Sequence, residues 1–266
     1  MKIGRFQLLK QEPGQDKGAA HYGVLDGDRF FEIPTPFDSP PHFPKKSDAN
    51  WSVSDVKLLP PCAPSKIVCV GRNYAAHAAE LGNEVPKEPL IFLKPSTAII
   101  GPGDPIILPE YSRRVEHEGE LGLVVARRCS HLTDQDDSLS YLAGYTALND
   151  VTARDLQKAD VQFTRAKGFD TFCPVGPWIE SEFDPSDVAV ETRVNGSVRQ
   201  SGRTSLMLFS PGVIVRWISR MMTLEPGDLI ATGTPAGVGP LLAGDTVEVS
   251  VQGVGVLRNP VQAFEA

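Results

Sequence analysis

The sequence predicts a β-rich α+β fold with few helices, and three observations support this. Glycine and proline together supply 24 + 23 = 47 of the 266 residues, about 18% against a usual share of roughly 12%. Short apolar runs bounded by Pro or Gly recur along the chain and outnumber segments with helical periodicity. Asn195-Gly196, between two alternating runs, predicts a two-residue β-hairpin.

Two proline-rich clusters divide the chain unevenly. Residues 1 to about 33 alternate weakly between apolar and polar types, which predicts a short strand meander. Prolines then break regular structure at 34–44 and again at 60–64. We therefore expect a small N-terminal module, residues 1–60, and a larger domain, residues 61–266.

Two segments of the larger domain predict helices. Asn73 can cap a helix over 74–81 that stops at a Gly-Asn pair. Pro211 opens a second helix, and we expect the Trp217 and Met221 stripe of this helix in the core. Short strands are expected at residues 67–70, 90–93, 106–108, 229–231, 246–251 and 254–257.

Composition and charge exclude several classes of protein. The net charge of −7 argues against nucleic acid as the main partner, because binding phosphates needs a basic face. No stretch reaches the roughly 18 apolar residues of a membrane span, and the N-terminus lacks the apolar core of a signal peptide. The four cysteines form no C-x-x-C pair and are expected to be reduced thiols of a cytoplasmic protein.

The most informative stretch carries alternating carboxylates. In a strand, Leu121 and Leu123 share one face, and Glu118 and Glu120 share the other. Two carboxylates this close repel each other unless something positive lies between them. A solvated strand face is the simple alternative, but apolar residues continue the same face. A bound cation explains both observations, and all-oxygen ligands favour Mg²⁺, Ca²⁺ or Mn²⁺.

Three nearby residues complete the candidates. Glu116 has the same parity and could be a further carboxylate on that face. His117 points to the other face of a regular strand, so we interpret it as structural. Asp150 is a candidate ligand from a separate segment, but it could equally be the N-cap of a helix that starts near Thr152. Spacing alone does not separate the two roles.

Six short motifs occur in order between about residues 65 and 257. They are Gly71-Arg72-Asn73-Tyr74 with His77 and Glu80, Phe92-Leu93-Lys94-Pro95-Ser96, His117-Glu118-x-Glu120-Leu121, Asn149-Asp150-Val151-Thr152-Ala153-Arg154-Asp155-x-Gln157, Ala166-Lys167-Gly168-Phe169-Asp170, and Gly233-Thr234-Pro235-x-Gly237-Val238-Gly239. In these motifs the chain closely resembles the fumarylacetoacetate hydrolase family.

The resemblance implies a fold, a cofactor and an assembly. The fold is the mixed β-sandwich roll of that family, the cofactor is a divalent cation, usually Mg²⁺ or Mn²⁺, and the assembly is commonly a homodimer. The resemblance also implies that Glu118, Glu120 and Asp150 are the metal ligands. Glu116 departs from the usual ligand set of the family, so it either supports the ligands from behind or is incidental.

His77 and Glu80 are three residues apart and share one face of the expected helix. A carboxylate beside an imidazole fixes its tautomer and raises its basicity. A surface helix pair is the common alternative. The resemblance favours a catalytic dyad that activates water, on a lid-like helix with Gly71 and Gly82 as hinges.

The remaining candidates are expected to contact the substrate. Lys167 is similar to the family lysine that faces substrate oxygens and could stabilise an enolate. Arg154 and Gln157 share a helix face and are expected to orient a substrate carboxylate or water, although Arg154 could instead pair with Asp155 at the surface. By resemblance, the Thr234 hydroxyl holds a substrate carboxylate.

Arg72 and Tyr74, from the first motif, complete the substrate-binding set. Lys94 is left without a role, because its motif could serve packing alone.

The leading prediction is a metal-dependent hydrolase that cleaves C–C bonds in acylpyruvate-like 2,4-dioxo acids. The cation would chelate the 2-oxo acid, and the His77–Glu80 dyad would activate water. Oxaloacetate-type β-keto acid decarboxylation is one alternative. Isomerisation or decarboxylation of 2-hydroxyhepta-2,4-diene-1,7-dioate in aromatic catabolism is another. A non-enzymatic β-protein with a structural cation site is the last, but such a site has no use for His77 and Lys167.

Overall fold

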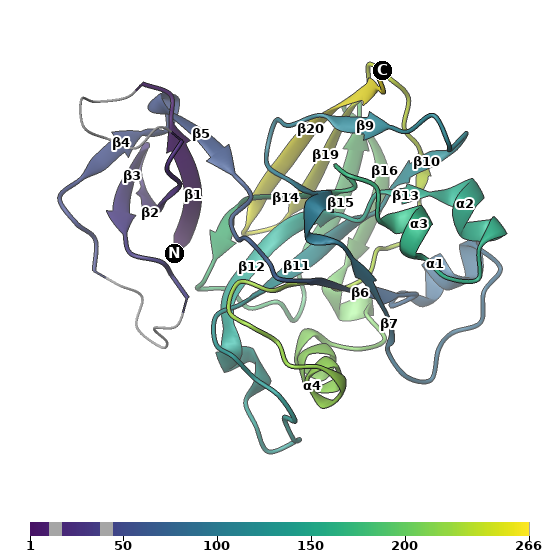
Figure 1. Ribbon diagram of the computed structural model, residues 1–266. Helices are drawn as coiled ribbons and strands as arrows, with labels where there is room; N and C mark the ends of the chain where they lie inside the picture. Colours follow the sequence, from purple (N-terminus) through teal and green to yellow (C-terminus); the bar gives the residue numbers. More distant parts are fainter. Residues whose placement is uncertain (11–17, 38–44, 266) are drawn as a thin grey trace.

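A computed structural model (Figure 1) describes residues 1–10, 18–37 and 45–265. Its main sheet has 12 strands, ten of which form a continuous path. In spatial order these are β4 (Asn50–Ser52), β3 (Arg29–Ile33), β2 (His21–Asp26), β1 (Lys2–Leu8), β14 (Cys173–Glu180), β12 (Leu142–Asn149), β11 (Gly119–Val125), β17 (Leu229–Ala231), β6 (Ile67–Gly71) and β7 (Leu90–Lys94). Off this path, β5 (Val56–Leu59) pairs with β1, and β8 (Ile99–Ile100) pairs with β14.

Two smaller sheets complete the β structure. The five-stranded sheet has the order β16 (Ser197–Arg203), β15 (Ala189–Val194), β19 (Thr246–Val251), β20 (Gly255–Ala263) and β9 (Ile106–Leu108). The three-stranded sheet consists of β13 (Thr152–Ala153), β10 (Val115–His117) and β18 (Gly239–Pro240). The predicted hairpin at Asn195-Gly196 is confirmed: it joins β15 to β16, and both turn residues have positive φ, as a type I′ turn requires.

The α-helices are α1 (Ala75–Glu80), α2 (Arg154–Ala159), α3 (Thr164–Lys167) and α4 (Pro211–Met221). In the described part of the chain, the 3₁₀ turns η1 (Val53–Asp55), η2 (Ser96–Ala98) and η3 (Ser138–Tyr141) each lie between two strands, and η4 (Thr204–Leu206) lies between β16 and α4. No helix within the described ranges is long and apolar enough to cross a membrane. The prediction of a β-rich fold with few helices is confirmed.

The main core lies between the 12-stranded and the five-stranded sheets. Leu121 and Leu123 of β11 pack in one cluster with Val190 of β15 and Val249 of β19. A second cluster, which includes Val124, covers the opposite face of β11. Every residue of β11 is therefore buried, and the alternation of its side chains separates two apolar layers rather than core from solvent.

The N-terminal strands confirm the expected meander and form a small module. Figure 1 shows β1 to β5 grouped at one side of the molecule, away from α1, α2 and α3. This module is attached through the sheet itself, because Lys2 and Ile3 of β1 lie opposite Glu180 and Ile179 of β14. The boundary at residue 60 stays a prediction.

Two local expectations are wrong. Asn73 does not cap α1, whose N-cap is Tyr74; its side-chain amide instead donates to Thr232 O (2.7 Å) and Phe209 O (3.0 Å). For Asn73, these tertiary contacts override the local pattern. The expected core position of Met221 is wrong as well, since Met221 is 51% exposed and Trp217 is half-buried, while Ile214 and Ile218 of the same helix are buried. The four cysteines are free and buried.

Candidate active site

The three predicted metal ligands meet at one end of β11 and β12. Glu118 separates β10 from β11, Glu120 is the second residue of β11, and Asp150 directly follows β12. The antiparallel register places Gly119 opposite Asn149, and Asp150 N donates to Glu118 O at 2.8 Å. One carboxylate oxygen from each of the three side chains lies within 4.8 Å of the others, and all three side chains are buried. We call these residues the acidic cluster.

Asp150 is therefore not a helix cap. The helix that follows, α2, has Ala153 at its N-cap, and β13 separates the two. The continuous strand expected through the carboxylates is also interrupted, because residues 115–117 pair in the three-stranded sheet and residues 119–125 in the main sheet. The interruption falls at Glu118.

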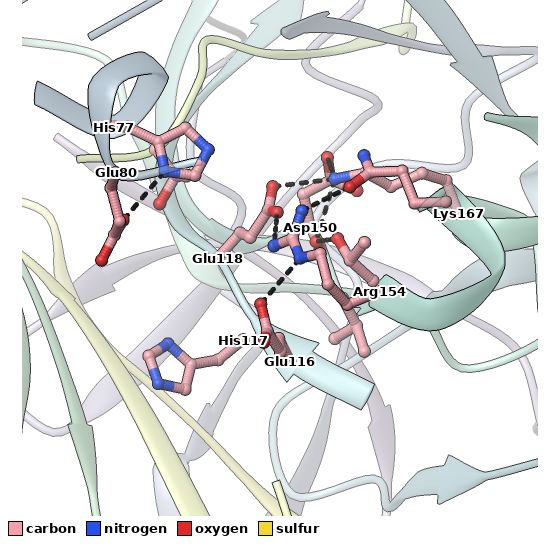
Figure 2. A network of polar contacts seen from close by, with 12 residues as sticks. His77, Glu80, Glu116, His117, Glu118, Asp150, Arg154 and Lys167 are labelled. Atoms are coloured by element: carbon pink, nitrogen blue, oxygen red, sulfur yellow. Dashed lines mark hydrogen bonds and ion pairs between the residues drawn. The ribbon is translucent and has the colours of Figure 1, made fainter. Parts of the chain in front are cut away.

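Buried cations contact two members of the cluster (Figure 2). Lys167 Nζ donates to Glu118 Oε2 at 2.8 Å and to Asp150 Oδ2 at 2.6 Å. Arg154 Nη2 donates to Glu118 Oε1. Lys94 Nζ donates to Asp150 Oδ1 at 2.6 Å, and its side chain is fully buried. These charge-assisted bonds hold the Glu118 and Asp150 carboxylates in a fixed arrangement.

The pKa shifts follow from these pairs. Burial raises the pKa of Glu118, but the charges of Lys167 and Arg154 outweigh it, so its pKa lies well below the usual range. Burial lowers the pKa of Lys167, but Asp150 and Glu118 more than reverse this, so its pKa is raised. Glu118 thus stays a carboxylate and Lys167 an ammonium.

Glu120 differs from its neighbours. Burial, and then the charges of Asp150 and Glu118, raise its pKa well above the usual value. Its one hydrogen bond comes from Gly233 N, at 2.7 Å, and no cationic side chain within the described residues pairs with it. Three converging oxygen donors, one of them without a counter-charge, fit a hard divalent cation. The cluster is thus a possible metal site.

Glu116 and His117 lie next to the acidic cluster but are not part of it. Glu116 accepts hydrogen bonds from Arg154 Nε (2.7 Å) and Arg114 Nε (2.6 Å), so it orients Arg154 and does not join the cluster. His117 is buried, and its Nδ1 lies 3.0 Å from Gln200 Oε1. Burial lowers the pKa of His117, and the imidazole is therefore neutral.

His77 and Glu80 lie on α1 and border the same site. His77 is buried, Glu80 is partly exposed, and 3.4 Å separates His77 Nδ1 from Glu80 Oε2. Gly237 N donates to both Glu80 oxygens, at 3.0 and 3.2 Å. Figure 2 shows His77 on one side of the Glu118 carboxylate and Lys167 on the other. The buried position of His77 contradicts the alternative of a surface helix pair.

These groups line a cavity of about 320 Å³. Its wall combines the acidic cluster with His77, Glu80, Arg72, Arg154, Gln157, Lys158, Lys167 and Thr234, together with the rings of Phe92 and Phe163. Arg72 has φ 58°, a left-handed conformation that is strained for a residue with a Cβ. Such strain concentrates at functional sites.

A comparison with family models decides the relationship. A family model described as "Fumarylacetoacetate (FAA) hydrolase C-terminal" matches residues 66–262, most of the chain. The chain belongs to the fumarylacetoacetate hydrolase family. A second model, "Rv2993c-like, N-terminal", matches residues 1–61.

Named relatives within the family cover most of the chain. Protein Rv2993c of Mycobacterium tuberculosis is 54% identical over 221 residues, 82% of this chain and 83% of that protein. The mitochondrial oxaloacetate tautomerase FAHD1 of Bos taurus is 44% identical over 205 residues, 75% and 92% of the two chains. A solved structure named 2-hydroxyhepta-2,4-diene-1,7-dioate isomerase, from Mycobacterium marinum, is 44% identical, with a TM-score of 0.88 over the whole of both chains. The predicted family and its fold are thus confirmed.

Within this family fold, Arg154 and Thr234, both expected to contact substrate, have hydrogen-bond partners in the protein. The Arg154 guanidinium is held by protein groups, because Glu116, Glu118 and Gln157 accept its hydrogen bonds, the last at 2.5 Å. The alternative of a surface pair with Asp155 is wrong, since Arg154 is buried and Asp155 accepts from Ser112 Oγ at 2.6 Å and from Arg113 N. Arg154 therefore orients Glu118, and because it also lines the cavity, its contact with a substrate carboxylate stays a prediction.

Thr234 lines the cavity, but its hydroxyl serves the backbone. Its Oγ1 donates to Gly119 O at 2.8 Å and accepts from Gln200 Nε2 at 2.7 Å, which leaves no proton for a substrate carboxylate. Tyr74 lies outside the cavity wall, and its hydroxyl is buried without a hydrogen-bond partner among the described residues.

The sequence reasoning missed the placement of two residues. Lys94 pairs with Asp150, and the available signal was a lysine that ends an apolar strand in the motif Phe-Leu-Lys-Pro. Gln200 bonds to both Gly119 and Thr234, and no local pattern marks it.

Proposed function

We propose that the protein is a divalent-cation-dependent enzyme that moves a proton at the carbon beside the 2-oxo group of a 2-oxo acid. This is the reaction type of a keto–enol tautomerase or a dienol isomerase. The observation that carries the proposal is the placement of His77 and Lys167 on opposite sides of Glu118 in one cavity. The names of the tautomerase and isomerase relatives, each 44% identical, support the same reaction class.

Glu118, Glu120 and Asp150 would hold the cation, which we propose to be Mg²⁺ or Mn²⁺, with Ca²⁺ as the third ion suited to oxygen ligands. A bound divalent cation would polarise the 2-oxo group and stabilise the negative charge that develops on its oxygen. Lys94 and Lys167 keep the Asp150 oxygens in place.

His77 is the proposed base. A hydrogen bond from Nδ1 to Glu80 leaves the lone pair on Nε2, which can then take a proton from the substrate carbon and return it elsewhere. Lys167 stays protonated beside Glu118 and Asp150, so it adds positive charge where the enolate forms. Phe92 and Phe163 supply apolar wall around the reacting atoms.

Hydrolysis of a C–C bond in an acylpyruvate is the second candidate. The contact between His77 and Glu80 favours it, because the same nitrogen could take a proton from water. Decarboxylation of a β-keto acid needs the cation but no base, so it should survive the loss of His77.

The test compares three substrates on metal-stripped protein with and without Mg²⁺ or Mn²⁺: oxaloacetate, acetylpyruvate and 2-hydroxyhepta-2,4-diene-1,7-dioate. Interconversion of isomers, read by enol or diene absorbance, is recorded separately from release of pyruvate or CO₂. We expect metal-dependent interconversion without release. Release of pyruvate from acetylpyruvate as fast as the enol disappears would replace this proposal with hydrolysis, and activity in EDTA would contradict both.

A further inference from the structure

Gln200 is a buried polar residue that the proposed mechanism does not use. It lies on β16, in the five-stranded sheet, whereas the acidic cluster comes from other segments. Its side-chain oxygen accepts hydrogen bonds from Gly119 N and His117 Nδ1, both at 3.0 Å. Its side-chain nitrogen donates to Thr234 Oγ1 and Pro235 O, both at 2.7 Å.

These four contacts use the full capacity of the amide, which has two lone pairs and two N–H donors. They also fix its orientation. A flipped amide would place its NH₂ group against the Gly119 N–H and its oxygen against the Pro235 carbonyl. Gln200 is therefore held in one conformation that matches donors to acceptors on both sides.

Two of the four partners of Gln200, His117 and Gly119, adjoin the proposed ligand Glu118 in the chain. Gly119 lies between Glu118 and Glu120, and the Thr234 hydroxyl that Gln200 contacts donates to Gly119 O at 2.8 Å. The N–H and C=O groups of Gly119 are thus both held by side chains. Thr234 follows Gly233, whose N–H binds Glu120 Oε2 at 2.7 Å.

A second residue of the five-stranded sheet also lies against the backbone at Gly119. Thr192 is the pairing partner of Gln200 in the sheet, and a Cβ added to Gly119 would lie 2.0 Å from Thr192 Oγ1. Only glycine permits this close approach of the sheet to the backbone between the two glutamates. The sheet therefore sets the position of this backbone by contact and by hydrogen bonding.

We propose that Gln200 is a positioning residue that sets the spacing of the Glu118 and Glu120 carboxylates and thereby the affinity of the site for a divalent cation. It joins the backbone between the two carboxylates to the loop that holds one of them. The inference rests on the proposed function only in that the acidic cluster binds a cation. Removing a residue that orients metal ligands typically weakens the affinity for the metal 10- to 100-fold.

The test uses Gln200→Met, which keeps the length of the side chain and removes the amide. The full chain is stripped of metal, and Mn²⁺ binding is measured by calorimetry and by electron paramagnetic resonance. We expect the dissociation constant for Mn²⁺ to rise about 10- to 100-fold, with a changed resonance spectrum of the bound ion. Circular dichroism verifies that the variant is folded.

Asn259→Leu is the matched control. Asn259 is also buried in the five-stranded sheet, and its amide donates to Gly101 O (2.8 Å) and Asp104 O (2.9 Å), away from the acidic cluster. Its replacement should lower the thermal midpoint without changing Mn²⁺ affinity. Equal weakening of Mn²⁺ binding in both variants would overturn the proposal, because general destabilisation would then explain the effect.

Thr234→Val keeps the test decisive if Gln200→Met does not fold. It removes the hydroxyl that Gln200 and Gly119 share, and we expect weaker Mn²⁺ binding in the same direction. Wild-type affinity in either folded variant would overturn the role of Gln200 but leave the proposed function standing. Failure of the wild-type protein to bind Mn²⁺ or Mg²⁺ would overturn both.

Discussion

Lys94 illustrates how the site accommodates charge inside an apolar core. It ends β7, its side chain has no exposed surface, and its ammonium bonds Asp150 Oδ1 and Val151 O. Removing one partner of a buried ion pair leaves the other charge uncompensated. This lowers the free energy of unfolding by far more than the intact pair contributes to it. Asp150 keeps Lys167 as a second partner, so the loss is moderated.

Lys94→Met should therefore lower the free energy of unfolding by about 3 kcal/mol, the lower end for a broken buried pair. Lys46→Met is the control, because the contact between Lys46 and Asp26 is exposed and its loss should cost less than about 1 kcal/mol. Urea denaturation of both variants measures the difference. Equal midpoints would show that Lys94 carries no structural charge pairing.

Glu118→Gln should abolish metal-dependent turnover, a loss of at least about 100-fold, because the amide cannot supply a charged ligand. It also leaves Lys167 and Arg154 facing a neutral group. Steady-state assays with oxaloacetate measure the loss. Glu225→Gln, at the exposed pair with Arg128, should keep wild-type turnover, and substantial activity in Glu118→Gln would remove Glu118 from the ligand set.

At the scale of residues, part of the candidate site could be predicted from the sequence. The period of a strand puts Glu118 and Glu120 on one face, and the structure brings them together with Asp150. The partners Lys94 and Gln200 could not be derived, because their contacts join residues 56 and 81 positions apart along the chain. Side-chain periodicity carries no information about such distant pairings.

Among the elements, α1 depends on contacts with the rest of the molecule. It is six residues long, too short to be stable alone, and the Glu80 carboxylate ties its last turn to Gly237 N. This contact holds His77 toward the acidic cluster. Loss of the contact should free the helix while the sheets stay intact.

Glu80→Ala should therefore speed amide hydrogen exchange over residues 75–83 and lower kcat, with no comparable change in β11 or β12. Glu84→Ala is the control, since Glu84 is exposed close to the end of α1. Exchange mass spectrometry reads both. Unchanged protection of α1 in Glu80→Ala would show that other packing holds the helix.

The elements also show where pattern reasoning fails. The six strand ranges expected from apolar runs were predictable and all overlap strands of the structure, because short apolar runs bounded by Gly and Pro have few alternatives. The interruption between β10 and β11 was not, since residues 116–125 alternate without a visible signal. The interruption lies beside Gly119, which Thr192 of β15 approaches closely, and a local pattern does not reveal such a tertiary contact.

For the whole molecule, a cation bound to the native state alone should raise stability by mass action. Mn²⁺ at 100 times its dissociation constant adds about 2.7 kcal/mol. For a chain of this size that corresponds to a rise in Tm of about 5 to 10 °C. Scanning calorimetry with Mn²⁺ and then excess EDTA measures the rise and its reversal. Glu120→Gln should lose the rise, and an equal rise in that variant would place the ion elsewhere.

The global arrangement was predictable only by resemblance. Local patterns indicate a strand meander at the N-terminus, but they do not show that β1 pairs with β14, about 180 residues away. The antiparallel attachment through Ile3 and Ile179 makes the N-terminal module an extension of the main sheet. The expected homodimer stays a prediction, which light scattering in solution would test.

The four buried cysteines allow local unfolding of the protein to be followed by thiol labelling. Burial raises the pKa of Cys173 to about 12 and that of Cys129 to about 11, so neither is a thiolate at neutral pH. A thiol reagent can therefore react only after local unfolding exposes the cysteine to solvent. Cys69 and Cys173 lie in strands of the main sheet, and Cys129 lies outside it. The order in which these thiols become labelled would therefore show which part of the molecule unfolds locally first.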